Sequence, residues 1–170
     1  KYQGSLDEML VSPMPNWVIL AGYVTGGVAR GLAVGTIVTT LSLFFTHLEI
    51  YNLGIITLVV LMTSILFSLG GFVNAVFANS FDDISIVPTF ILTPLTYLGG
   101  VFYSIDLLPD FWAGVSQLNP ILYMVNAFRY GILGVSDIPV GYALLVISVF
   151  IVALFSYCMH LLNTGKGIRK

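Results

Sequence analysis

The chain has 170 residues, of which 58% are hydrophobic and only 8% are charged, and its mean hydropathy is +0.99. About a quarter of the residues in a soluble domain are charged, so this composition excludes an ordinary soluble protein and favours membrane lipid as the surroundings. A formal net charge of -2 also excludes the basic surface that nucleic-acid binding requires.

The first sixteen residues, 1–16, predict a short cytoplasmic helix rather than a span. Ser5 stands three residues before Glu8, as in a capping box, and Pro13 and Pro15 end the segment and stiffen its connection to the next one. A helix tied this tightly to a span can transmit force into it. The alternative interpretation is a loop.

Four segments are long and apolar enough to cross a bilayer, which takes about 20 helical residues. The expected spans are 26–46, 53–78, 86–103, with prolines at 88 and 94, and 142–162. Four crossings put both ends of the chain on one side of the membrane. The tail, 163–170, carries three cations directly after the last span, so the positive-inside rule assigns that side to the cytoplasm.

Residues 105–136 predict a pair of short helices on the outer face. Pro120 divides a charge-free stretch, because proline lacks a backbone donor and disfavours helix in the residue before it. We expect one helix over about 108–118 and another from Pro120, both entering the membrane and packing on the spans. Apolar residues recur there at helical spacing, which leaves Asn119, Asn126 and Arg129 for polar surroundings.

Arg30 is the one basic residue embedded in apolar sequence. If the first span begins near Gly26, Arg30 lies about one turn inside the cytoplasmic boundary, and its long side chain reaches the headgroups at small cost. The alternative is that Arg30 lines an inner cavity, because charged groups within a membrane usually face the interior of a bundle. Arg129 has two similar interpretations, an anchor at the outer interface or a contact with substrate.

Glycines recur along the first span at the spacing that allows two helices to approach closely. The pairs are 22 and 26, 27 and 31, and 31 and 35. Small residues four apart form such a face in membrane helices, so we expect helix packing here.

The sequence contains no pattern typical of catalysis or of ATP binding. It has no G-x-x-x-x-G-K-[ST], G-x-S-x-G or H-E-x-x-H motif, and one cysteine with two histidines makes a poor metal set. We therefore expect no catalytic residue, cofactor or metal in this chain. A non-catalytic membrane scaffold fits the hydropathy equally well. An intramembrane enzyme is a further alternative, for which Arg30, Asn74, Cys158 and His160 offer no nucleophile and base pair.

Two stretches together resemble the second-type ABC exporter permeases of bacteria. They are residues 4–13, GSLDEMLVSP, and residues 108–129, which contain LPDFW and then LNPILYMVNAFR. The resemblance covers essentially the whole chain. It implies an all-α, polytopic membrane helix bundle of six spans, of which this chain supplies spans three to six, the C-terminal part of one permease domain, with about two spans before Lys1.

The resemblance also implies partners and sites. Such permeases form dimers in the inner membrane with two separate ATPase subunits, which would bind ATP and Mg. Residues 4–13 would be the coupling helix, and 105–136 the re-entrant helices. The exported compound would be an unidentified small molecule of drug, lipid or glycan type. Asp7, Glu8, Ser12 and Pro13 are the residues expected at the ATPase interface, and Asn119, Pro120 and Arg129 those expected in the outer gate region.

Overall fold

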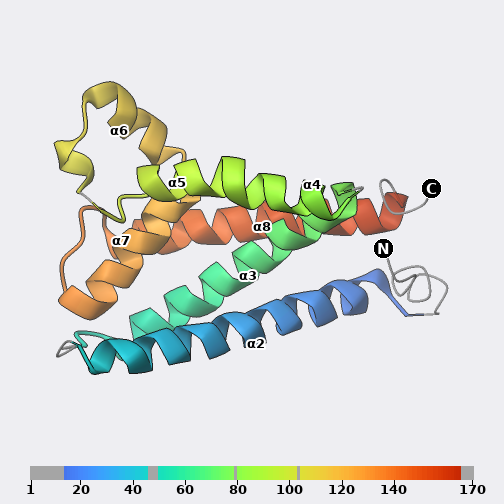
Figure 1. Ribbon diagram of the computed structural model, residues 1–170, viewed down its shortest axis with the longest axis horizontal. Coiled ribbons are helices and arrows are strands. Elements are labelled where there is room, and N and C mark those ends of the chain that lie inside the picture. The colour runs from blue at the N-terminus through green and yellow to red at the C-terminus, as the bar shows by residue number, and fades with distance from the viewer. Residues whose placement is uncertain (1–13, 46–49, 79, 103, 166–170) are drawn as a thin grey trace.

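All regular elements in the described part of the chain are helices, which confirms the all-α expectation (Figure 1). The computed structural model describes residues 14–45, 50–78, 80–102 and 104–165.

Three helices are long and apolar enough to cross a membrane. They are α2 (Asn16–Leu43), α3 (Leu53–Phe77) and α8 (Val140–Thr164). They run lengthwise beside one another, with α3 packed on both α2 and α8 (Figure 1). Asn52 caps α3 by accepting a hydrogen bond from the Ile55 amide at 3.1 Å. The bounds of α3 and α8 lie close to those expected for the second and fourth spans.

The third expected span, 86–103, is a chain of three short segments rather than one α-helix. These are α4 (Phe81–Ile86), the π-helix η1 (Val87–Leu92) and α5 (Thr93–Leu98), which follow one another without a break. Pro88 and Pro94 cause this, because each lacks the amide that an α-helix needs. The Thr93 hydroxyl and amide instead both donate to the Pro88 carbonyl. A helical segment of this length is roughly 27 Å long, close to the hydrocarbon thickness.

The helix that contains the first expected span starts ten residues before Gly26. α2 begins at Asn16, directly after Pro15, whose extended backbone forms the N-terminal boundary. Asn16 Nδ2 donates to Asn163 Oδ1 at 2.8 Å, so the start of α2 lies beside the end of α8 (Figure 1). Both therefore lie at one end of the bundle.

Glycine allows α2 to pack closely on α3. A methyl group on Gly31 would lie 2.6 Å from Ser64 Oγ, and one on Gly27 would overlap Ser68. These two glycines provide the predicted close packing. Within the described ranges the other expected glycine contacts are not made, since a side chain at Gly22 or Gly26 would meet nothing there within 4 Å.

Two clusters of buried side chains hold the bundle together. One joins α2, α3 and α8 near the end where α2 starts. The other joins α3 and α8 to α7 (Pro120–Leu133), and so fixes the position of α7. The first contains Leu20, Leu69, Phe72, Val76, Cys158, Leu161 and Leu162, and the second Val59, Leu66, Leu122, Tyr123, Met124, Ala127, Ala143 and Ile147.

The segment between α5 and α8 contains three shorter helices at the end of the bundle opposite the start of α2 (Figure 1). η2 (Ile105–Leu107) is a single 3-10 turn, α6 (Asp110–Gln117) follows Pro109, and α7 begins at Pro120. The break at Pro120 is the one predicted, because proline suits the first position of a helix and ends the preceding one.

Candidate functional site

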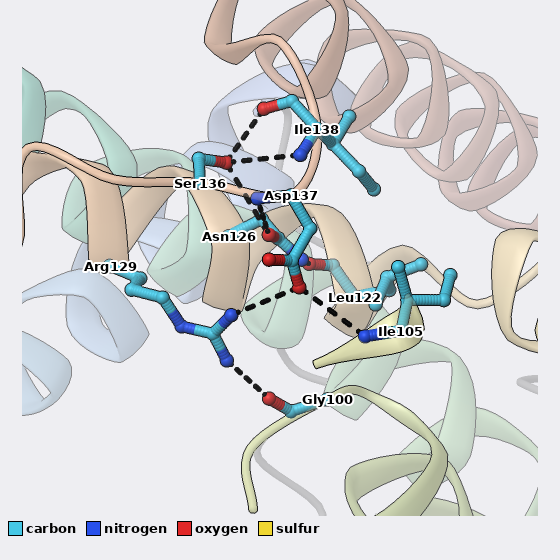
Figure 2. Close-up of polar contacts among 8 residues, drawn as sticks. All are labelled: Gly100, Ile105, Leu122, Asn126, Arg129, Ser136, Asp137 and Ile138. Carbon is cyan, nitrogen blue, oxygen red and sulfur yellow. Dashed lines mark hydrogen bonds and ion pairs between the residues drawn. The ribbon is translucent and has the colours of Figure 1, made fainter. Parts of the chain in front are cut away.

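The expected gate residues lie on and around α7, where loops from three parts of the chain converge (Figure 2). Polar contacts connect α7 to the turn after α5 and to the loop before α8, and that loop is bonded in turn to the start of η2. We call this group the α7 polar cluster, and its residues are Gly100, Ile105, Leu122, Asn126, Arg129, Ser136, Asp137 and Ile138.

Arg129 joins α7 to two loops. Its Nη1 forms an ion pair with Asp137 Oδ2 at 3.1 Å, and its Nη2 donates to the Gly100 carbonyl at 2.7 Å (Figure 2). The same Asp137 oxygen accepts from the Ile105 amide at 3.3 Å. The two side chains are 22% and 18% exposed, so water screens this pair only partly. The guanidinium therefore has protein partners on both of its terminal nitrogens.

Asn126 organises the loop before α8 from a fully buried position. Its Oδ1 accepts from the Asp137 amide at 3.0 Å and from Ser136 Oγ at 3.4 Å, while its Nδ2 donates to the Leu122 carbonyl at 3.0 Å (Figure 2). The polar surroundings expected for Asn126 are present, but they are groups of the protein. A buried amide satisfied in this way specifies one conformation of the loop.

Asn119 fastens the start of α7 to α5. Its Oδ1 accepts from the Ile121 amide at 3.0 Å as a helix cap, and its Nδ2 donates to the Leu95 carbonyl of α5 at 2.6 Å. A helix leaves its last carbonyls without internal partners, so Asn119 satisfies groups at two helix ends at once. Pro120 occupies the first turn, where no amide is needed.

Two glycines allow the sharp turns that bring these loops together. Gly100, whose carbonyl receives Arg129, has φ +71°, and Gly134, which ends α7, has φ +72°. Other residues rarely adopt this left-handed conformation. Both turns of the cluster therefore depend on glycine.

Further contacts hold α7 at both of its ends. At the first, Tyr123 donates its hydroxyl to the Gln117 carbonyl at 2.7 Å. Burial, and then the neighbouring Tyr142, raise the pKa of Tyr123, so the hydroxyl keeps the proton that it donates. At the other end, the Asn52 amide donates to the Gly131 carbonyl at 2.8 Å, which joins the end of α7 to the start of α3.

The structure brings together Asn119, Pro120 and Arg129 around α7, and it places Arg30 elsewhere. Arg30 is exposed and lies about halfway along α2. Because α2 starts at Asn16, Arg30 lies about four turns from the start of its helix, and its depth in the membrane stays a prediction. The expected ATPase-contact residues, Asp7, Glu8, Ser12 and Pro13, lie outside the described residues.

Sequence reasoning did not identify Asn126, Ser136 and Asp137 as one network. One signal was present, since Arg129 is the single cation in a segment that also contains Asp137. The α7 polar cluster holds α7 and the neighbouring loops in position, because its charged groups, Arg129 and Asp137, already have hydrogen-bond and ion-pair partners in the protein. Among the described residues, no group of three or more His, Cys, Asp or Glu side chains is placed to hold a metal ion.

Comparison with known proteins gives one family and several relatives. Residues 1–133 match the ABC-2 type transporter family. The protein named inner membrane transport permease YadH, from Escherichia coli K12, E. coli O157:H7 and Shigella flexneri, is 55% identical over 169 residues in each case. The match covers 99% of this chain and 66% of each relative, so the chain spans just under two thirds of their length. No solved structure gives a significant match.

Proposed function

Since the chain belongs to the ABC-2 type transporter family, we propose that it is the C-terminal part of a permease subunit of an ATP-driven exporter in the bacterial inner membrane. The chain is a transport permease with membrane-spanning helices and not a catalytic enzyme. Its ATPase partner, its second permease copy, the cytoplasmic position of both of its ends and its exported compound belong to the proposal.

One observation supports the proposal most directly: the start of α2 and the α7 polar cluster lie at opposite ends of the bundle (Figure 1). Residues 4–13, the proposed coupling helix, precede α2 in the sequence, and the proposed outer gate surrounds α7. A permease that converts events on one side of a membrane into opening on the other needs this separation. The lack of a phosphate-binding motif agrees with ATP and Mg binding to a separate ATPase chain.

Packed contacts provide a continuous route between the two ends. α2 packs on α3 through Gly27 and Gly31, and the start of α3 is joined to the end of α7 by the Asn52 amide and the Gly131 carbonyl. In the proposed mechanism, ATP closes the ATPase, the coupling helix moves with it, and α2 and α3 carry the displacement to α7. ATP shifts the permease between inward-facing and outward-facing states only because it binds them unequally.

The exporter proposal is tested with the full-length permease and its ATPase, produced together and reconstituted in vesicles. We expect the two chains to purify together and ATP hydrolysis to rise when a transported drug, lipid or glycan is added. The combined charge reversal Asp7→Lys and Glu8→Lys, and separately Pro13→Ala, should reduce both readouts. Asp110→Lys reverses a charge on α6, far from the coupling segment, and serves as the control.

Two results would contradict the proposal. Unchanged co-purification and hydrolysis in the Asp7, Glu8 and Pro13 variants would remove the coupling assignment. A stable complex whose hydrolysis responds to no compound in a broad screen would favour the membrane scaffold instead.

A further inference from the structure

α2 has two faces that contain glycine, and the described residues cover only one of them. Gly27 and Gly31 face Ser68 and Ser64 of α3, whereas a Cβ built on Gly22 or Gly26 would have no atom of a described neighbour within 4 Å. A groove of about 570 Å³ runs along this uncovered face. We call it the α2 groove, and its lining includes Met14, Val18, Gly22, Tyr23, Gly26 and Arg30.

Arg30 lies midway along α2 in this groove, which is mid-depth when the three long helices are centred in the bilayer. The Asn16 to Asn163 hydrogen bond fixes the level of one end of the bundle, and Arg30 lies about 21 Å further along α2. Its neighbour Gly31 faces Ser64, which is close to the midpoint of α3. An arginine side chain at this depth is too short to bring its charge to the headgroups on either side, which lie about 15 Å away.

The charge of Arg30 has no compensation within the described part of the chain, where the guanidinium forms no hydrogen bond or ion pair. Arginine within a membrane is costly unless it faces the bundle interior, a water-filled cavity or an opposite charge. The face that carries Arg30 must therefore be covered in the assembled permease.

The three long helices of a second copy do not supply the missing charge. None of the eight acidic residues of the chain lies in α2, α3 or α8. Asp82 and Asp83 are in the first turn of α4, and Asp110 is the first residue of α6. The acyl chains of lipid carry no anion at this depth either. The group that pairs with Arg30 is therefore found neither in the long helices of a second copy nor in the acyl chains of lipid.

We propose that the α2 groove is the docking site of a membrane-spanning helix from the part of the full-length permease outside these 170 residues. That helix carries an aspartate or glutamate at mid-depth, paired with Arg30. The relatives have room for it, because the match covers only 66% of their length. The proposal depends on the membrane-spanning arrangement and not on which compound is transported.

The shape of the groove favours a helix over a small ligand. Gly22 and Gly26 are four residues apart with no side chain, which lets the backbone of another helix approach closely. The same spacing at Gly27 and Gly31 already receives α3 on the neighbouring face. Tyr23 packs its ring against Phe72 of α3 at 5.6 Å and forms one wall. A carboxylate opposite Arg30 would accept two parallel hydrogen bonds from the guanidinium.

Disulfide cross-linking of the full-length permease in native membranes tests the proposal. In a Cys158→Ser background, Gly26→Cys is combined with single cysteines along each span outside these 170 residues. We expect cross-links within one copy at positions three or four apart on one helix. Gly31→Cys with Ser64→Cys is the positive control, because a Cβ on Gly31 would lie 3.3 Å from Ser64 Cβ. Gly35→Cys, an open position outside the α2 groove, is the negative control.

Charge exchange identifies the paired carboxylate. Arg30→Glu should lower the amount of assembled permease several-fold, and changing the one acidic residue on the cross-linked helix to arginine should restore it. If neither charge variant assembles, the cross-linking pattern still shows whether a helix occupies the α2 groove, because the Gly26→Cys variant keeps Arg30.

Three outcomes would overturn the proposal. A cross-link between Gly26→Cys of two copies would assign the groove to the copy-to-copy interface. Absence of any cross-link, with normal assembly of Arg30→Gln, would leave the groove to lipid. Absence of any cross-link with loss of substrate-stimulated ATP hydrolysis in Arg30→Gln would make Arg30 a cavity residue that contacts the transported compound. Cross-linking needs no transport, so failure of the exporter proposal would not affect it.

Discussion

α7 and α2 differ most in how far this chain encloses them. Seven of the 14 residues of α7 are buried, against two of the 28 residues of α2. Hydrogen bonds also join α7 to α3, to α5 and to the loop before α8. α2 makes one side-chain hydrogen bond to another described helix, between Asn16 and Asn163.

This contrast shows that the described residues enclose α7 by themselves but leave most of the surface of α2 uncovered. Lipid is as apolar as leucine, so exposed apolar side chains on a membrane helix need no explanation, and packing comes from close contact and polar bonds. α7 has both kinds of contact. α2 has close contact along one strip only, and the charge of Arg30 on another face indicates that further protein belongs there.

The largest effect should come from the buried amide of α7. Asn126→Ala removes three hydrogen bonds of a fully buried side chain, so we expect a loss of about 3 kcal/mol in the free energy of unfolding. Asn16→Ala on α2 removes only an exposed bond and should cost less than about 0.5 kcal/mol. Unfolding of the purified permease by sodium dodecyl sulfate in mixed micelles measures both. Equal losses would contradict the contrast between the helices.

Leucine truncation compares the two helices without polar groups. Leu122 of α7 is 1% exposed and Leu41 of α2 is 54% exposed. Leu122→Ala should cost about 2 kcal/mol, at the low end for core leucines, because the unfolded chain still keeps the side chain in lipid or detergent. Leu41→Ala should change stability by less than about 0.5 kcal/mol. A large loss for Leu41→Ala would mean that another protein segment covers that position.

Glycine substitution separates the covered strip of α2 from the rest of the helix. Gly27→Ala forces a methyl group into Ser68 and should cost about 1 to 2 kcal/mol. Gly35→Ala meets nothing within 4 Å and should be neutral or stabilising by up to about 1 kcal/mol, since alanine favours helix. The same unfolding measurement applies. The order of the two variants would be reversed if α2 were not packed on α3 through Gly27.

Much of the fold could be predicted from hydropathy and proline alone. Long apolar runs identified α3 and α8, and Pro120 separated α6 from α7, because these signals depend on neighbouring residues. The start of α2 was placed ten residues too late, because the first span was expected from Gly26, with Arg30 near its cytoplasmic end. A charged residue indicates the end of a membrane span only where no other protein segment covers that residue. Whether a segment covers it depends on tertiary structure. The π-helix η1 was also missed, because sequence shows that Pro88 breaks a hydrogen bond but not how the helix compensates.

The site was predictable only in part. Pro120 was identified as a helix break and Asn119 as a residue for polar surroundings, both also through the family resemblance, and the structure puts both at the start of α7. The partners of Asn126 could not be predicted, since the Asp137 amide and the Ser136 hydroxyl reach it through a loop whose path the sequence does not specify. A polar residue on an apolar helix face has the same sequence pattern whether water or a loop surrounds it.

The smallest predicted effect is the coupling between Arg129 and Asp137. Arg129→Gln should cost more than Asp137→Asn, because only the arginine change also removes the bond to the Gly100 carbonyl. In a double-mutant cycle we expect a coupling of about 0.5 to 1 kcal/mol, the usual value for a pair that water reaches in part. The coupling should shrink in high salt, which screens such pairs. Arg129→Gln combined with Asp110→Asn is the matched control, since no contact joins that pair, and its effects should add. Additive effects in both cycles would mean that the polar network of Asn126, and not the ion pair, holds α7 to the loop before α8.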